Sequence, residues 1–283
     1  MDFFCILSAL LFFFGNLLKL IYYRKERNRN EVTWEEYKTL DPAIIDIEWE
    51  FRIDNKPHRL AAGIINSFAW LVFCIPIFQL AYVLSLQKGS LRSLWVHTSI
   101  VVLVLAGACM EWIGCLTFLG AFVSCELLFT DFNLRYWYSD TNGDLLGFRA
   151  LEVVFIAIRG MQVWIDAFEW IAIFFVMVFV YIGVRRFSTV NPFVFPSNWN
   201  LLGLFIGILA LLDFLAEVLR IKSFVMFSKI AFIYAGINRL IFIPLWLIGL
   251  GLRLPFATKT IESDANASSP AHEQSAVETE IFN

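Results

Sequence analysis

The stretch WNLLGLFIGILALLDFLAEVL, residues 199–219, is long and apolar enough to cross a lipid bilayer as a single helix. A helix rises about 1.5 Å per residue, so about 20 residues span a hydrocarbon core of about 30 Å. Hydrocarbon offers no partner for a backbone amide, which favours a helix because its hydrogen bonds lie within the segment. The stretch nevertheless contains two acids, Asp213 and Glu217. Both are expected to face other helices and not lipid.

The whole chain has the composition of a membrane protein. Its 283 residues are 59% hydrophobic and 17% charged, with a mean hydropathy of +0.69, whereas a soluble chain carries about a quarter charged residues. We therefore predict an all-α fold, a polytopic transmembrane helix bundle of about six spans. The predicted spans are residues 3–22, 61–86, 96–125, 162–184, 199–219 and 224–252.

The spans and the segments between them divide the chain into four parts. The last part has few apolar residues and many Ser, Ala and Glu, a composition typical of disorder. We predict an N-terminal membrane anchor helix at 1–23, a cytoplasmic loop at 24–60, a five-span helical membrane domain at 61–256 and a disordered tail at 257–283.

The distribution of basic residues predicts that the N-terminus and the tail lie on the extracytoplasmic side. The first span has no basic leader, and the basic residues Arg24 and Lys25 follow it. Lys and Arg are also more frequent in the predicted loops 24–59, 129–161 and 220–229 than in the loops on the opposite side, as the positive-inside rule requires. The tail contains the glycosylation sequon Asn266-Ala267-Ser268, which is modified only on the lumenal side.

Several classes of function are excluded by what the sequence lacks. There is no Gly-x-Ser-x-Gly motif and no phosphate-binding loop, so we expect no enzymatic activity. The three histidines are far apart and the five cysteines fall in apolar stretches, so we expect no metal site and no cofactor. No basic block is interleaved with aromatic residues, and the net charge is −3, so a nucleic-acid partner is not expected.

The acids of residues 199–219 share one helix face with small residues. At about 100° per residue, Gly203, Gly207 and Ala210 lie on the same side as Asp213 and Glu217. Small residues four apart let a neighbouring helix come close, so this face is predicted to pack against another helix. The two carboxylates therefore point into the bundle.

Other spans carry charges at similar depth. Lys229 lies as far from the boundary between the fifth and sixth spans as the two acids do, which makes it their predicted partner. Arg239 lies deeper, and the acid nearest to it in depth is Glu111, which predicts a second, weaker pair. In the fourth span, polar side chains form one stripe. The predicted buried charge cluster is Arg159, Asp166, Glu169, Asp213, Glu217 and Lys229.

Residues 46–54, DIEWEFRID, alternate charged and apolar side chains without a break. A period of two is typical of a strand with one wet face, so the cytoplasmic loop is predicted to contain a short strand. Its apolar face either packs on the protein itself or on the membrane surface, or its free edge docks another protein.

Two function hypotheses follow for this multi-pass membrane protein. The favoured one is transport or permeation of an ion or small solute through the buried charge cluster, because intramembrane ionisable groups mark pathways. The alternative is a non-catalytic structural or adaptor protein that docks a partner through residues 24–60. In that case the buried charges only fix which helices meet.

Overall fold

The structure is a computed structural model that describes residues 2–26, 56–86, 91–131, 145–190, 193–223 and 233–268. The described chain contains no strand, and the predicted all-α bundle is confirmed. Its helices are α1 (Phe3–Glu26), α4 (Lys56–Ser85), α5 (Leu91–Asp131), α7 (Leu145–Val190), α8 (Ser197–Ser223), the π-helical turn η1 (Asn238–Phe242) and α10 (Ile243–Ser268).

Six segments of the described chain are long and apolar enough to cross a membrane, as the sequence predicts. The last of them includes the helical residues 233–237, η1 and most of α10. The six segments are Phe3–Ile21, Leu60–Ser85, Leu94–Thr117, Gly160–Ser188, Ser197–Leu219 and Ile233–Ile261.

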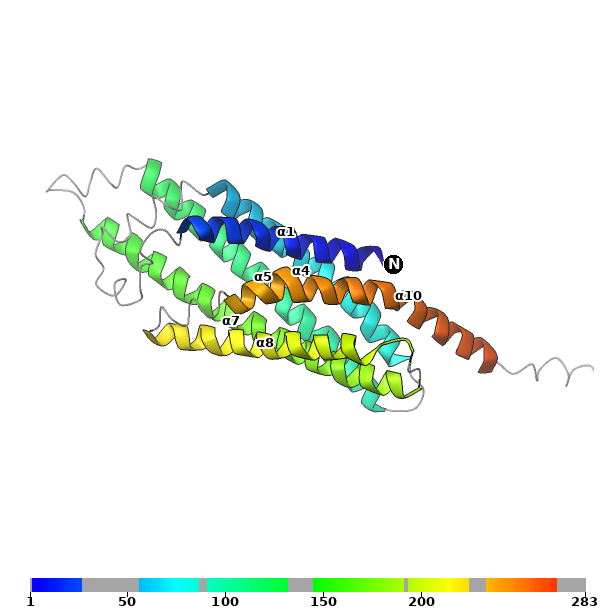
Figure 1. The fold of residues 1–283 in the computed structure, drawn as a ribbon. Coiled ribbons are helices and arrows are strands. Elements are labelled where there is room, and N and C mark those ends of the chain that lie inside the picture. Colours follow the sequence, from blue (N-terminus) through cyan, green and yellow to red (C-terminus); the bar gives the residue numbers. More distant parts are fainter. Residues whose placement is uncertain are drawn as a thin grey trace, which may run out of the picture.

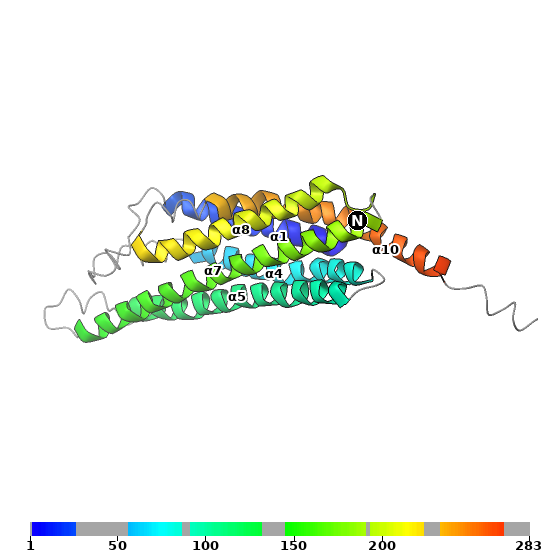
Figure 2. The same cartoon turned by 90° about the horizontal axis from the view of Figure 1, so that it is seen from below.

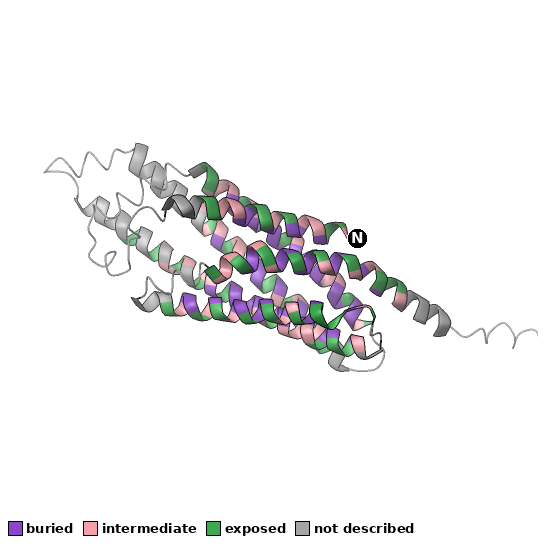
Figure 3. Ribbon diagram, in the orientation of Figure 1, coloured by how far each residue is buried: buried purple, intermediate pink, exposed green. Residues whose placement is uncertain are grey.

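The helices run side by side as an elongated bundle (Figures 1 and 2). Helix α1 packs against α4 and α10, α4 packs against α5, α5 against α7, and α7 against α8. The N-terminus of α1 and the C-terminal part of α10 lie at the same end, where the Asp2 amide donates to the Gly251 carbonyl at 2.9 Å. Buried and exposed residues alternate along the coloured parts of the helices (Figure 3).

Aromatic side chains hold α8 against α10. The indole rings of Trp199 and Trp246 stack with centroids 5.0 Å apart, and the Trp199 indole N–H donates to the Trp246 carbonyl at 3.0 Å. The predicted small-residue face of α8 makes this approach possible, because a Cβ on Gly203 would lie 2.9 Å from Trp246 Nε1. One turn further on, a Cβ on Gly207 would lie 3.0 Å from Met177 Cβ of α7. Ala210 on the same face is fully buried.

Two helices are much longer than a bilayer. The 41 residues of α5 and the 46 residues of α7 correspond to about 62 and 69 Å, so both extend past the hydrocarbon at the end opposite the N-terminus (Figures 1 and 2). The loop predicted at 129–161 is therefore wrong over 145–161, which belongs to α7. The prediction failed because Arg149, Glu152 and Arg159 end an apolar span, yet charged residues are good helix formers and do not end a helix.

Part of the predicted disordered tail is helical. Helix α10 continues to Ser268, so residues 257–268 are helical, and residues 269–283 lie outside the described chain. The reason is a core-facing stripe, because Leu254 and Ala257 are buried and Ile261 packs against the same core. The predicted strand at 46–54 lies outside the described residues as well.

Candidate intramembrane charge site

Close helix packing brings three carboxylates together from α5 and α7. Glu111 is on α5, and Asp166 and Glu169 lie three residues apart on one face of α7. A Cβ on Gly114 of α5 would lie 3.0 Å from Ile165 Cγ2 of α7, so the two backbones approach closely at this level. The ligand oxygens of the three acids all lie within 4.8 Å of one another.

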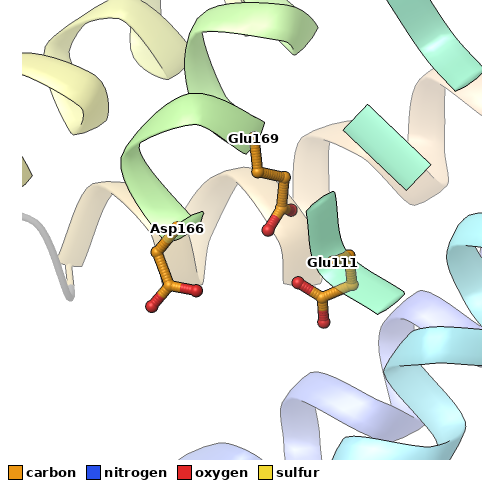
Figure 4. A group of neighbouring side chains, drawn as sticks. All are labelled: Glu111, Asp166 and Glu169. Carbon is orange, nitrogen blue, oxygen red and sulfur yellow. The ribbon is translucent and has the colours of Figure 1, made fainter. Parts of the chain in front are cut away.

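The three side chains converge on one region of the bundle interior (Figure 4). Glu169 and Asp166 project from neighbouring turns of α7, and Glu111 projects toward them from α5. The neighbouring Trp112 indole donates to the Ser67 carbonyl of α4 at 3.2 Å, which anchors α5 beside α4 at this depth. The backbone that carries Glu111 is thus fixed on both sides.

Arg239 of η1 compensates part of this negative charge. Its Nη2 donates to Glu169 Oε1 at 2.5 Å. Both side chains are buried, with 7% of the Arg239 side chain and 0% of the Glu169 side chain exposed. Its guanidinium carbon also lies 4.5 Å from the centroid of the Trp170 ring, a cation–π contact. The π-helical turn that carries Arg239 ends two residues before Pro244, whose missing N–H removes a helical hydrogen bond.

Several polar atoms of this pair remain without a hydrogen bond. Glu169 Oε2 and Arg239 Nε are buried and have no hydrogen-bond partner in the described chain. The adjacent Asn238 donates to the Ile206 carbonyl of α8 at 3.2 Å, but its Oδ1 atom is also unpartnered. Protein groups in the described chain therefore supply only part of the hydrogen bonds that these buried atoms can make, although buried polar groups are normally hydrogen-bonded.

Helix α8 adds two further acids to the surroundings of Arg239. Asp213 is fully buried, and its carboxylate makes no well-aligned hydrogen bond in the described residues, although the Ala235 amide lies close to it. The Asp213 carboxylate is close enough to Arg239 to attract it electrostatically. Glu217 is 8% exposed, and its carboxylate is close enough to Asp213 and Asp166 to repel both. On the other side, the Lys19 amine of α1 lies within range of Glu111 and Asp166.

The charges lie well inside the membrane-spanning segments. At about 1.5 Å per residue, Glu111, Asp166, Glu169 and Arg239 are about 9 to 14 Å from the ends of their spans. Those ends are at the side of the bundle opposite the N-terminus (Figure 1). Two unit charges 4 Å apart repel by about 4 kcal/mol at an effective dielectric constant of about 20. Three neighbouring carboxylates beside one guanidinium are therefore a site that attracts positive charge.

The structure brings together most of the predicted site residues and changes one pairing. Arg239, predicted to pair with Glu111, makes its ion pair with Glu169 instead, and Glu111 lies next to that pair. Lys229, the predicted partner of Asp213, lies outside the described chain, as does the side chain of Arg159. Those two contributions to the cluster stay predictions.

Two features of this layer were missed from the sequence. The first feature is Lys19, in the last turn of the first span. Its place at the end of an apolar run was the only sign in the sequence that it could reach the charged groups of the bundle. The second feature is a buried amide pair, in which Asn16 Nδ2 of α1 donates to Asn66 Oδ1 of α4 at 3.1 Å. The sequence does not show that these two side chains touch, because they belong to different spans.

No protein-family model, curated protein or solved structure matches this chain. The six apolar helices make it a multi-pass integral membrane protein, and its activity has to be inferred from the charge site.

Proposed function

We propose that this protein moves a cation across its membrane and that Glu111, Asp166 and Glu169 form the intramembrane point at which the cation binds. The observation that carries the proposal is the excess of acid within the membrane-spanning segments. The half-buried Glu111 and Asp166 and the fully buried Glu169 lie with their ligand oxygens within 4.8 Å of one another beside one guanidinium, and the fully buried Asp213 lies nearby. A cation or proton entering this region relieves repulsion that the protein's own groups leave in place.

The excess of acid also argues against a purely structural role. A buried ion pair that only fixes helix packing needs one acid for each base, and an additional buried carboxylate destabilises the fold. Ionisable groups within a membrane are costly, and those that are retained usually line ion or solute pathways. Glu111 and Asp166 are not needed to complete the pair between Glu169 and Arg239.

The adaptor hypothesis stays a prediction. Most of the segment on which it depends, residues 24–60, lies outside the described chain, which resumes at Lys56. The described residues add no observation that favours it over cation transport.

Reconstitution into liposomes tests the transport proposal. Purified protein is incorporated, gradients of H⁺, Na⁺, K⁺, Ca²⁺ and Mg²⁺ are imposed one at a time, and their dissipation is followed with ion-sensitive dyes. We expect flux of at least one cation above that of empty liposomes, and its loss in Glu111→Gln. Absence of flux for every cation with monodisperse, inserted protein would reject the proposal.

Asp2→Asn is the matched control for the loss of one carboxylate. Asp2 Oδ1 accepts hydrogen bonds from the amides of Phe4 and Cys5 at the start of α1, and Asn caps a helix about as well as Asp. Its flux should equal that of the unmodified protein. Unchanged flux in Glu111→Gln, with a lowered melting temperature, would assign these acids to stability and not to transport.

A further inference from the structure

The spacing of the three carboxylates matches the first coordination shell of one metal ion. Ca²⁺ binds oxygen ligands at about 2.4 Å, so two ligands on opposite sides of the ion are about 4.8 Å apart. The ligand oxygens of Glu111, Asp166 and Glu169 lie within that limit of one another. Ca²⁺ also accepts a flexible coordination geometry, whereas Mg²⁺ binds at about 2.1 Å and demands a near-ideal octahedron.

The chemistry of the group selects a hard cation. Its three ligands are carboxylates, and oxygen ligands suit Ca²⁺, Mg²⁺ and Mn²⁺, whereas softer metals prefer imidazole or thiolate. In the described chain, the acids Glu111, Asp166, Glu169, Asp213 and Glu217 interact with only two bases, Arg239 and Lys19. A divalent ion offsets more of this excess of acid than a monovalent ion does.

Two buried carboxylates, one in the triad and one next to it, also favour the binding of a positive ligand. Glu169 is 0% exposed, and its Oε2, which makes no well-aligned hydrogen bond in the described chain, faces the Glu111 carboxyl group (Figure 4). Asp213 is also 0% exposed, has only the Ala235 amide as a nearby backbone donor, and is close enough to Arg239 to interact with it electrostatically. Such oxygens require a proton, a water molecule or a cation.

We propose that Glu111, Asp166 and Glu169 form a binding site for a divalent cation, and that Ca²⁺ binds there better than Mg²⁺ because its coordination geometry is less strict. Arg239 is the counter-charge of this site: it binds one Glu169 oxygen and lies against the Trp170 ring, while the second Glu169 oxygen faces the Glu111 carboxyl group. The inference deepens the proposed transport function by naming its ion.

This site could not be recognised from the sequence because its ligands come from two helices. Asp166 and Glu169 have the spacing of neighbours on one helix face, but the third ligand, Glu111, is more than fifty residues away on α5. The sequence-based expectation that there is no metal site considered histidine and cysteine clusters, and this site contains neither residue.

Equilibrium binding in detergent tests the site without reference to transport. Purified protein is freed of metal with a chelator and titrated with Ca²⁺ and, separately, with Mg²⁺ by isothermal titration calorimetry. We expect one Ca²⁺ per chain, weaker binding of Mg²⁺, and at least a tenfold loss of Ca²⁺ affinity in both Glu111→Gln and Asp166→Asn. Asp2→Asn should bind as the unmodified protein does.

A conservative variant separates loss of a ligand from loss of the fold. Glu111→Asp keeps the charge and is expected to lose less affinity than Glu111→Gln at a similar melting temperature. Absence of Ca²⁺ binding, or binding that neither amide variant weakens, overturns the proposed metal site even if the liposomes show flux of another cation. Site-dependent binding without flux of any cation supports the metal site and rejects transport.

Discussion

Arg239 and Glu169 are 70 residues apart in sequence and form a 2.5 Å ion pair in the interior of the bundle. The pair connects η1 to α7. It also places the only guanidinium of the described site beside an acidic triad that it cannot fully neutralise. Stability and the proposed ion binding therefore depend on the same contact.

Removal of one partner of this pair is expected to destabilise the protein strongly. Glu169→Gln leaves the Arg239 guanidinium buried without its ion-pair partner, a change that costs about 3–5 kcal/mol in comparable buried pairs. The double variant Glu169→Gln with Arg239→Gln removes both charges and should be more stable than the single variant. Reversible unfolding in mixed micelles measures both values. A loss below about 1 kcal/mol in the single variant would contradict a stabilising role of the pair.

The close contact between α7 and α8 predicts a different kind of stability loss. In Gly207→Val, the new side chain meets Met177 Cβ at 3.0 Å and the Phe174 carbonyl at 3.4 Å, so overpacking should cost about 1–3 kcal/mol. Gly236→Val is the matched control, because nothing lies within 4 Å of a Cβ at that helical position. Thermal unfolding in detergent compares the two. Equal melting temperatures would mean that α7 and α8 are further apart than described.

Arg239→Gln tests the link between the counter-charge and the metal. Without the guanidinium, the repulsion among Glu111, Asp166 and Glu169 is offset only by the Lys19 amine in the described site, so the metal-free variant should melt at a lower temperature than the unmodified protein. Ca²⁺ should then raise its melting temperature by more than it raises that of the unmodified protein. A ligand at one hundred times its Kd stabilises a folded state by about 2.7 kcal/mol.

Arg239→Lys is a second variant for the same comparison with the unmodified protein, and it serves alone if Arg239→Gln does not fold. Lysine keeps one positive charge but loses the planar guanidinium that rests on Trp170, so an intermediate response to Ca²⁺ is expected. A Ca²⁺-induced shift that is equal in all three proteins would show that Arg239 does not compete with the metal.

The sequence predicted the spans well because hydropathy depends on residues that are consecutive in the chain. All six predicted segments overlap an apolar helical segment, but the sixth, predicted at 224–252, corresponds to Ile233–Ile261 and shares only residues 233–252 with it. The inward orientation of Asp213 could also be predicted, since Gly203 and Gly207 on the same face identify the side that packs against other helices. Both arguments use information within one helix.

The pairing of charges could not be predicted, because it depends on which helices are neighbours. Lys229 was chosen from its distance to a span boundary, and the ion pair of Glu169 depends on the order of six helices around the bundle, which the sequence does not state. The length of α7 was missed for a different reason. Charged residues such as Arg149 mark the end of an apolar segment but allow the helix to continue.

Cysteine accessibility along α8 distinguishes a hydrated pathway from a dry seam. In a background without the natural cysteines, Asp213→Cys should react with a membrane-impermeant thiol reagent, since a fully buried carboxylate without a well-aligned hydrogen bond in the described chain needs water or an ion to reach it. Leu212→Cys and Leu215→Cys are the controls. Their side chains are 40% and 45% exposed on the outside of the bundle, where lipid keeps the reagent away. Labelling at position 213 that Ca²⁺ slows would place that water beside the acidic triad. Equal protection of all three positions would mean that the helices pack without a pathway, and cation transport through this site would have to be abandoned.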